Sequence, residues 1–133
     1  MAAPTGRAAK RMSETSNKEA KTIHRLLEMG FGMDSDELTF MKNEEDPIDA
    51  DVVILDEVSM VDIVLMYSLL RAIKSGTRLL IVGDSDQLPS VGAGNVLKDL
   101  IDSEVINTVR LNEIFRQAQE SMIVVNEIGR AHV

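Results

Sequence analysis

Two short apolar runs in the middle of the chain end abruptly in acidic residues. Val52–Leu55 is followed at once by Asp56 and Glu57, and residues 79–82 are followed by the stretch Gly-Asp-Ser-Asp-Gln. Neither run alternates apolar with polar positions, which is typical of strands in a parallel sheet that is covered on both faces. The pattern therefore predicts two buried strands, each of which delivers polar side chains at its carboxyl end.

Helix signals follow both runs. Asp62 is a favourable N-cap for a helix over residues 63–74, and Gly76 lies just beyond the end of that helix. Asn95 can cap a further helix that continues to about Ile101. Between the second run and Asn95 the sequence is rich in Gly and contains a Pro, so we expect a long loop there.

The N-terminal part is predicted to be helical after an initial turn. Pro4 and Gly6 indicate the turn, and residues 7–14 form a short basic helix. Residues 18–29 are predicted to form a second helix, ended by Gly30, because apolar residues recur at helical spacing. This apolar stripe consists of Ile23, Leu26 and Leu27.

The other segments are less regular. Residues 31–51 form a long acidic connection with a possible short strand at 38–41, and residues 105–109 are a third strand candidate. Residues 114–125 are mostly helical in pattern, although 122–125 alone could be a strand. Strands that alternate with helices in this way predict an α/β domain with a mainly parallel sheet. In such domains ligands bind at the carboxyl ends of the strands.

Composition limits the class of protein. A length of 133 residues suits one domain, and an apolar fraction of 44% is enough for a core. The absence of Cys excludes disulfides and thiolate metal sites, and two His are too few for a zinc site without carboxylates. No apolar run is long enough for a transmembrane helix or a signal peptide. We therefore expect no membrane association and a cytoplasmic protein.

Charge is distributed unevenly along the chain. The net charge is −8, which by itself argues against nucleic-acid binding. Residues 1–29, however, hold six basic and three acidic side chains, whereas residues 34–51 hold eight acidic side chains and one Lys. A surface for nucleic acid is therefore predicted near the N-terminus, although a solvated helix face would have the same charge.

The polar residues at the strand ends are of the types that phosphoryl transfer requires. The reaction needs a carboxylate for Mg²⁺, a group that orients the attacking water and a cation near the γ-phosphate. Asp56 suits the first role and Glu57 the second, while Gln87 can donate and accept hydrogen bonds near the phosphate. Arg116 is a candidate cation. Taken singly, each residue could also belong to a solvated turn, a simple loop or a surface ion pair.

Together, six segments resemble the RecD type of superfamily 1 DNA helicases. They cover residues 2 to about 126 in the family's order. The first is Ala-Pro-Thr-Gly-Arg-Ala-Ala at residues 3–9, which is similar to motif Ia of the family, and the second is Thr-Ile-His-Arg-Leu-Leu within residues 21–27. Residues 43–51 resemble the approach to motif II, and Asp-Glu-Val-Ser-Met-Val-Asp at residues 56–62 resembles motif II itself. Residues 82–94 resemble motif III, and residues 114–118 resemble motif IV.

The resemblance implies a RecA-like P-loop NTPase fold and a function. The family couples hydrolysis of ATP, with Mg²⁺, to 5′-to-3′ movement on single-stranded DNA in DNA repair and recombination. By this resemblance Asp56 binds magnesium and Glu57 activates water. Gln87 and Arg116 contact the γ-phosphate. The residues that contact DNA phosphates are Pro4, Thr5, Gly6 and Arg7.

The sequence also departs from the family. It contains no GxxxxGK[ST] loop, so residues 1–126 are predicted to be a partial first motor domain without the Walker A strand and loop. We expect that this chain alone does not hydrolyse ATP. Residues 127–133 resemble the translation of a common sequencing adapter and are interpreted as a non-native tail.

Three origins stay open at this point. The parent protein could be a stand-alone RecD-like helicase or the alpha subunit of a multi-subunit exonuclease complex. The chain could instead be a non-catalytic module that binds DNA or a partner. Such a module would need to protect an open sheet edge, for example by forming a homodimer, because exposed edge strands promote aggregation.

Overall fold

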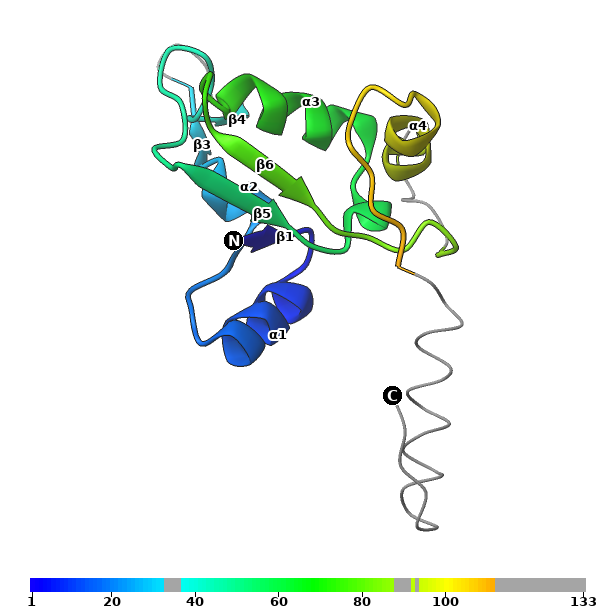
Figure 1. Ribbon diagram of the computed structural model, residues 1–133. Coiled ribbons are helices and arrows are strands. Elements are labelled where there is room, and N and C mark those ends of the chain that lie inside the picture. Colours follow the sequence, from blue (N-terminus) through cyan, green and yellow to red (C-terminus); the bar gives the residue numbers. More distant parts are fainter. Residues whose placement is uncertain (33–36, 88–91, 93, 112–133) are drawn as a thin grey trace, which may run out of the picture. The chain divides into compact units, whose positions relative to one another are not determined.

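The computed structural model of the chain is an α/β structure (Figure 1). It describes residues 1–32, 37–87, 92 and 94–111. The chain divides into two units, residues 1–103 and 104–133, and the helices and strands given below belong to the first. The predicted helix at 114–125, the motif IV-like segment and the proposed tail at 127–133 lie outside the described residues, as do 88–91 and 93 of the motif III-like segment.

Four parallel strands form the central sheet. They are β1 (Ala2–Ala3), β2 (Lys21–Thr22), β5 (Val52–Leu55) and β6 (Arg78–Ile81), in the order β2-β1-β5-β6. All three pairings are parallel, and β5 is in register with β6 along its whole length. The predicted parallel α/β class is therefore confirmed, with the second apolar strand placed one residue earlier than its sequence run.

Helices connect the parallel strands. Helix α1 (Gly6–Ser16) joins β1 to β2, and α3 (Ile63–Ala72) lies on the path from β5 to β6 (Figure 1). The cap of α3 is the predicted one, since the Asp62 side chain accepts a hydrogen bond from the backbone N–H of Leu65. Helix α4 (Val96–Asp102) is capped by Asn95, also as predicted. A short 3₁₀ helix, η1 (Val58–Met60), was not predicted.

The predicted helix over residues 18–29 is wrong. The segment divides into β2, a single helical turn α2 (Ile23–Leu26) and β3 (Met29–Phe31), so Gly30 lies in a strand and does not end a helix. The Lys21 backbone N–H donates to the carbonyl of Met1, which draws the start of the segment into the sheet. The apolar positions were nevertheless identified correctly, because Ile23 and Leu27 are fully buried.

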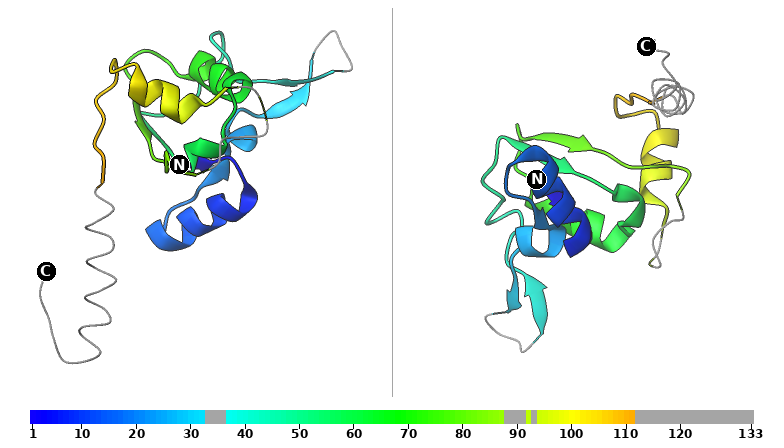
Figure 2. Two further views of the ribbon diagram at one scale, coloured as in Figure 1. Left: turned by 90° about the vertical axis from the view of Figure 1, so that its right-hand side faces the viewer. Right: turned by 90° about the horizontal axis from the view of Figure 1, so that it is seen from below.

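A hairpin replaces part of the long acidic connection. Strand β3 pairs antiparallel with β4 (Leu38–Phe40), which confirms the possible strand at 38–41 with one residue fewer. Figure 2 shows this hairpin reaching away from the four-stranded sheet. Several of its apolar side chains are exposed, among them Phe31 and Leu38.

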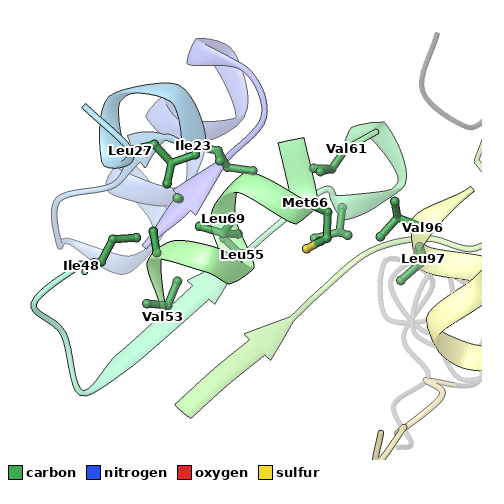
Figure 3. Close-up of a cluster of buried hydrophobic side chains, with 13 residues drawn as sticks. Ile23, Leu27, Ile48, Val53, Leu55, Val61, Met66, Leu69, Val96 and Leu97 are labelled. Carbon is green, nitrogen blue, oxygen red and sulfur yellow. The ribbon is translucent and has the colours of Figure 1, made fainter. Parts of the chain in front are cut away.

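Side chains alternate between the two faces of the sheet. On one face, Val53 and Leu55 of β5 meet Met66 and Leu69 of α3 in the main core. Figure 3 shows this cluster extending from Ile23 and Leu27 at one end to Val96 and Leu97 at the other. On the opposite face, Ala3 packs against Ala8 and Ala9 of α1. Neighbouring residues of β1 thus contribute to different clusters, as strand geometry requires.

Strand β5 is not covered on both faces as its apolar run predicted. Val52 is 50% exposed, and Leu80, on the same face of neighbouring β6, is 53% exposed. Helix α1 packs on β1 and does not extend over this area in the part of the chain that the structure describes. A continuous apolar run therefore did not distinguish burial on one face from burial on both.

The third strand candidate, at residues 105–109, is also wrong. The segment is not assigned to a strand, and Val105 and Val109 are 81% and 87% exposed. A strand needs a neighbour to pair its backbone groups, and β propensity alone does not supply one.

Candidate functional site

Three loops begin from the same end of neighbouring strands. Ala2, Leu55 and Ile81 are aligned in register across β1, β5 and β6. The chain leaves these strands at residues 4–7, 56–57 and 83–87, which we call the carboxyl edge of the sheet. Parallel pairing therefore brings together the predicted DNA-contacting segment, the predicted acidic pair and the predicted glutamine loop.

Asp56 is fixed by backbone contacts at the end of β5. Its N–H donates to the carbonyl of Ala2 at 3.0 Å, which continues the β1–β5 pairing beyond the strands. Its Oδ1 accepts from the N–H of Glu57 at 2.8 Å, so the carboxylate also supports the turn that follows. Asp56 is half-buried, at the position where the sequence predicted a magnesium ligand.

Glu57 has an unusual backbone conformation and an ion pair. Its φ of 54° and ψ of 41° lie in the left-handed region, which costs a residue with a Cβ about 1 kcal/mol or more. Its Oε1 lies 2.7 Å from Nη2 of Arg11 in α1. The ion pair thus holds the Glu57 side chain toward α1.

Gln87 is connected to the acidic loop through a serine. The hydroxyl of Ser59, in η1, donates to Oε1 of Gln87 at 2.9 Å. Ser59 is 6% exposed, whereas Gln87 is exposed. A buried hydroxyl needs a partner, and the glutamine carbonyl provides it. The NH₂ group at the other end of the amide can itself donate hydrogen bonds.

The loops after β5 and β6 also approach each other closely. The Val58 N–H donates to the carbonyl of Val82 at 3.1 Å. A Cβ on Gly83 would lie 2.8 Å from Cδ2 of Leu97 and 3.4 Å from the backbone nitrogens of Val58 and Ser59. Glycine at this position therefore allows the two loops and α4 to pack together.

Residues 4–7 form the entry to α1. Thr5 is the N-cap, and its hydroxyl accepts from the N–H of Ala8 at 3.2 Å. Gly6 and Arg7 are exposed, and Pro4 and Thr5 are half-buried. The helix N-terminus and the exposed Arg are features that suit a phosphate group. Arg116, the predicted cationic residue, lies outside the described residues.

The edge offers only part of a metal site. No group of three His, Cys, Asp or Glu side chains is close enough to hold a metal among the described residues. Mg²⁺ prefers oxygen ligands and is commonly held by one or two carboxylates together with nucleotide phosphates. Asp56 fits that arrangement as the single protein carboxylate.

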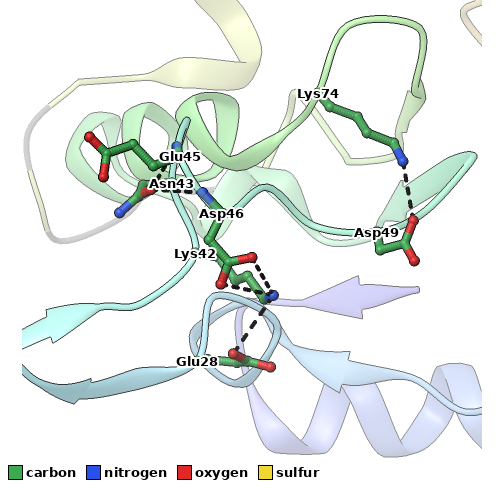
Figure 4. A network of polar contacts seen from close by, with 7 residues as sticks. All are labelled: Glu28, Lys42, Asn43, Glu45, Asp46, Asp49 and Lys74. Atoms are coloured by element: carbon green, nitrogen blue, oxygen red, sulfur yellow. Dashed lines mark hydrogen bonds and ion pairs between the residues drawn. The ribbon is translucent and has the colours of Figure 1, made fainter.

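Part of the acidic connection before β5 forms ion pairs with nearby cations. Lys42 contacts Asp46 at 3.3 Å and Glu28 at 3.9 Å, and Lys74 contacts Asp49 at 3.1 Å (Figure 4). The side-chain Oδ1 of Asn43 accepts hydrogen bonds from the backbone N–H groups of Glu45 and Asp46. Together with the ion pair between Glu44 and Arg71, these contacts give cation partners to three of the acidic side chains of the segment.

Arg71 of α3 provides the strongest of these contacts. Its Nε and Nη2 donate to the two carboxylate oxygens of Glu44 at 2.7 and 2.8 Å, and the guanidinium lies over the ring of Tyr67. The hydrogen bonds from Arg71 lower the pKa of Glu44 to about 2. Arg71 also lines a pocket of about 160 Å³ between β4 and α3, which includes none of the predicted site residues.

Sequence reasoning missed two residues of the carboxyl edge, Arg11 and Ser59. Arg11 follows Arg7 by four positions, which places both on the same face of a helix. Ser59 stands within the acidic motif itself. The sequence did not indicate that Arg11 contacts Glu57 or that Ser59 contacts Gln87, because the partners are 46 and 28 positions apart in the chain.

Comparison with known proteins places these features in a family. The family described as "AAA domain" matches residues 1–93. The chain is 42% identical over 132 residues to the ATP-dependent RecD2 DNA helicase of Deinococcus radiodurans, covering 99% of this chain and 17% of that protein.

Two further relatives are subunits of a larger enzyme. The RecBCD enzyme subunit RecD of Mycobacterium tuberculosis is 39% identical over 118 residues, covering 77% of this chain and 20% of that subunit. The same subunit of Haemophilus influenzae is 35% identical over 121 residues, covering 75% of this chain and 18% of that subunit. The chain therefore spans about a fifth of the length of the curated relatives it matches.

Proposed function

Because the chain belongs to the AAA domain family, and within it to the RecD-type helicases, we propose that it acts as part of the first motor domain of an ATP-dependent DNA helicase. In this proposal ATP hydrolysis drives 5′-to-3′ movement on single-stranded DNA. The observation that carries it is the carboxyl edge, where the segments of three sequence motifs leave neighbouring parallel strands in register.

Each residue of the edge has a role in the proposed reaction. Asp56 would hold the magnesium ion of the bound nucleotide. The nucleotide would supply the phosphate to be transferred, and the magnesium ion would neutralise part of the phosphate charge. Glu57 would orient and deprotonate water. Gln87 would donate a hydrogen bond from its NH₂ group to the γ-phosphate, since its carbonyl oxygen accepts from the Ser59 hydroxyl. Arg116 would supply the additional cation.

The DNA surface in this proposal is the entry to α1. Pro4, Thr5 and Gly6 shape the helix N-terminus, and Arg7 is exposed beside it. Contacts of backbone N–H groups and Arg side chains with phosphates position a strand without reading its bases. Binding at this surface would therefore be independent of sequence and sensitive to salt.

We propose that this chain does not hydrolyse ATP by itself. The sequence contains no GxxxxGK[ST] segment, and that loop is what surrounds the nucleotide phosphates in P-loop enzymes. Purified chain should show no magnesium-dependent ATPase activity above background. Turnover that survives repurification and disappears in the Asp56→Asn variant would contradict this part of the proposal.

Transplantation into a complete helicase tests the catalytic roles. The matching stretch of the Deinococcus radiodurans relative would be replaced by residues 1–126 of this chain, and ATPase activity stimulated by single-stranded DNA would be measured. We expect activity in the chimera and a loss of about 100-fold or more with Glu57→Gln, as for removal of a general base. Glu45→Gln, a matched exposed carboxylate, should retain activity. Equal activity of both variants would exclude the role of Glu57.

The names of the relatives suggest two ways in which such a motor domain could be used, in a helicase that acts alone or in a subunit of a larger enzyme. One relative is named an ATP-dependent DNA helicase, and others are named as subunits of the RecBCD enzyme. We propose the stand-alone type, with exonuclease subunits as alternative partners. Co-purification of the parent protein with nuclease subunits at a fixed ratio would favour the alternative.

A further inference from the structure

The contact between Arg11 and Glu57 joins two surfaces that the proposed function keeps separate. Arg11 belongs to α1, one turn after Arg7 and the DNA-contacting entry. Glu57 belongs to the loop after β5, where water is to be activated. The single hydrogen bond between Nη2 and Oε1, at 2.7 Å, is a direct contact between the two.

The pair is accessible to a competing ligand. The side chain of Arg11 is 64% exposed and that of Glu57 is 25% exposed. Ion pairs between side chains of such exposure contribute little to stability, because water solvates both partners when they separate. A second anion that reaches Arg11 can therefore replace the carboxylate at small cost.

A DNA phosphate is the anion best suited to do so. Arg7 and Arg11 are four residues apart on one helix, which places both guanidinium groups on the same face. Both residues are exposed, and Lys10 adds a third cation to the same helix. A guanidinium binds phosphate through two parallel N–H donors, whereas it meets Glu57 here through one.

We propose that Arg11 is a shared cation that pairs either with Glu57 or with a backbone phosphate of single-stranded DNA. Without DNA, the pair holds the Glu57 carboxylate toward α1. When a phosphate takes Arg11, the carboxylate is released to face the nucleotide. Arg11 thus positions Glu57 in response to DNA, and this inference rests on the proposed DNA surface and on the proposed role of Glu57.

The test uses DNA binding by the complete 133-residue chain and needs no ATP. Fluorescence anisotropy would measure the affinity for a labelled oligothymidylate in the wild type, Glu57→Gln, Arg11→Gln and the double variant, at several salt concentrations. Glu57→Gln should bind more tightly by at most about fivefold at 0.1 M salt, since DNA no longer has to displace an exposed ion pair from Arg11. In the Arg11→Gln background the same change should have no effect.

Two controls separate the shared cation from general electrostatics and from misfolding. Glu19→Gln removes a different exposed carboxylate from the basic N-terminal region and should change affinity less than Glu57→Gln does. Arg11→Lys keeps the charge and should restore part of the gain. Far-ultraviolet circular dichroism and thermal unfolding of each variant identify any that fail to fold. If Arg11→Gln does not fold, Arg11→Met, which also removes the charge, replaces it in the comparison.

The outcomes distinguish this inference from the function on which it rests. An equal gain from Glu57→Gln with and without Arg11 would show a general charge effect and overturn the shared cation. If DNA binding is lost with Arg7→Gln but unaffected by any change at Arg11 or Glu57, the shared cation is also overturned. That result would still support the proposed DNA surface. Absence of binding in every protein would overturn both.

Discussion

The two βαβ units of the sheet are built from different kinds of residue. In β5–α3–β6, large side chains such as Leu55, Met66 and Leu69 form the main core. In β1–α1–β2, the contact between helix and sheet consists of Ala3, Ala8 and Ala9 with Met12 at its margin. Buried area, and therefore hydrophobic stabilisation, is much smaller in the second case.

This difference separates a supporting unit from a surface unit. The unit around α3 fixes the strand ends that carry Asp56 and the glutamine loop. The unit around α1 exposes Arg7 and Arg11 and is held by small contacts, by its cap and by the pairing of β1 with β5. We therefore expect α1 to open locally at lower free energy than α3, which suits a segment that must respond to DNA.

Truncation of a core side chain in each unit should show the largest difference. Leu69→Ala removes a fully buried side chain from the main core, and we expect it to lower the free energy of unfolding by about 2–5 kcal/mol. Met12→Ala, which removes a partly buried side chain beside the alanine cluster, should cost about 1 kcal/mol. Urea unfolding measured by circular dichroism gives both values. Equal costs would contradict the comparison.

The two helix caps provide a matched test of local against global stability. Thr5 and Asp62 each accept a hydrogen bond from the third residue of their helix. Replacement of either by Ala should cost about 1 kcal/mol. Amide hydrogen exchange should show loss of protection confined to α1 for Thr5→Ala, whereas Asp62→Ala should lower protection throughout the core. Uniform loss in both variants would mean that the two units unfold together.

Removal of the serine hydroxyl tests the connection between the two loops of the supporting unit. Ser59→Ala should cost about 0.5–1.5 kcal/mol, the usual net contribution of one hydrogen bond. Nitrogen-15 relaxation of the Gln87 side-chain amide should show increased motion in this variant, and Ser59→Thr should restore the order. An unchanged amide in Ser59→Ala would exclude the role of Ser59 in orienting Gln87.

The smallest expected effect is a dependence on pH at the outer surface of α3. The pKa of Glu44 is lowered to about 2 by Arg71, so the ion pair stabilises the folded state above the ordinary carboxyl pKa and is lost as pH falls toward 2. Because the pair is exposed, Glu44→Gln should shift the thermal midpoint only slightly at pH 6. Thermal scans should show this shift shrinking between pH 5 and 2, whereas a constant shift would point to another cause.

Local sequence determined most of the supporting unit. The apolar runs gave β5 and β6, with the second placed one residue late, and Asp62 and Asn95 were correctly identified as caps. Such signals are local, since a cap or an apolar run acts through neighbours within a few positions. The motif residues on these elements were therefore predicted to meet at one edge of the sheet, and the parallel register brings their segments there.

Only tertiary structure decided how the remaining segments are used. Residues 18–29 have helical periodicity, but pairing with β1 and with β4 placed Lys21–Thr22 and Met29 in strands. Residues 105–109 have strand composition, but they belong to no strand of the structure. In both cases the backbone hydrogen bonds depend on a partner distant in sequence, which no local pattern specifies.

The contacts that give the edge its proposed chemistry are also tertiary. The sequence identified Glu57 and Gln87 as residues of interest, but the structure supplied their partners, Arg11 and Ser59. The physical reason is the same in each case. Residue type and spacing determine what a side chain can bind, whereas the fold determines which of many possible partners lies within hydrogen-bonding distance.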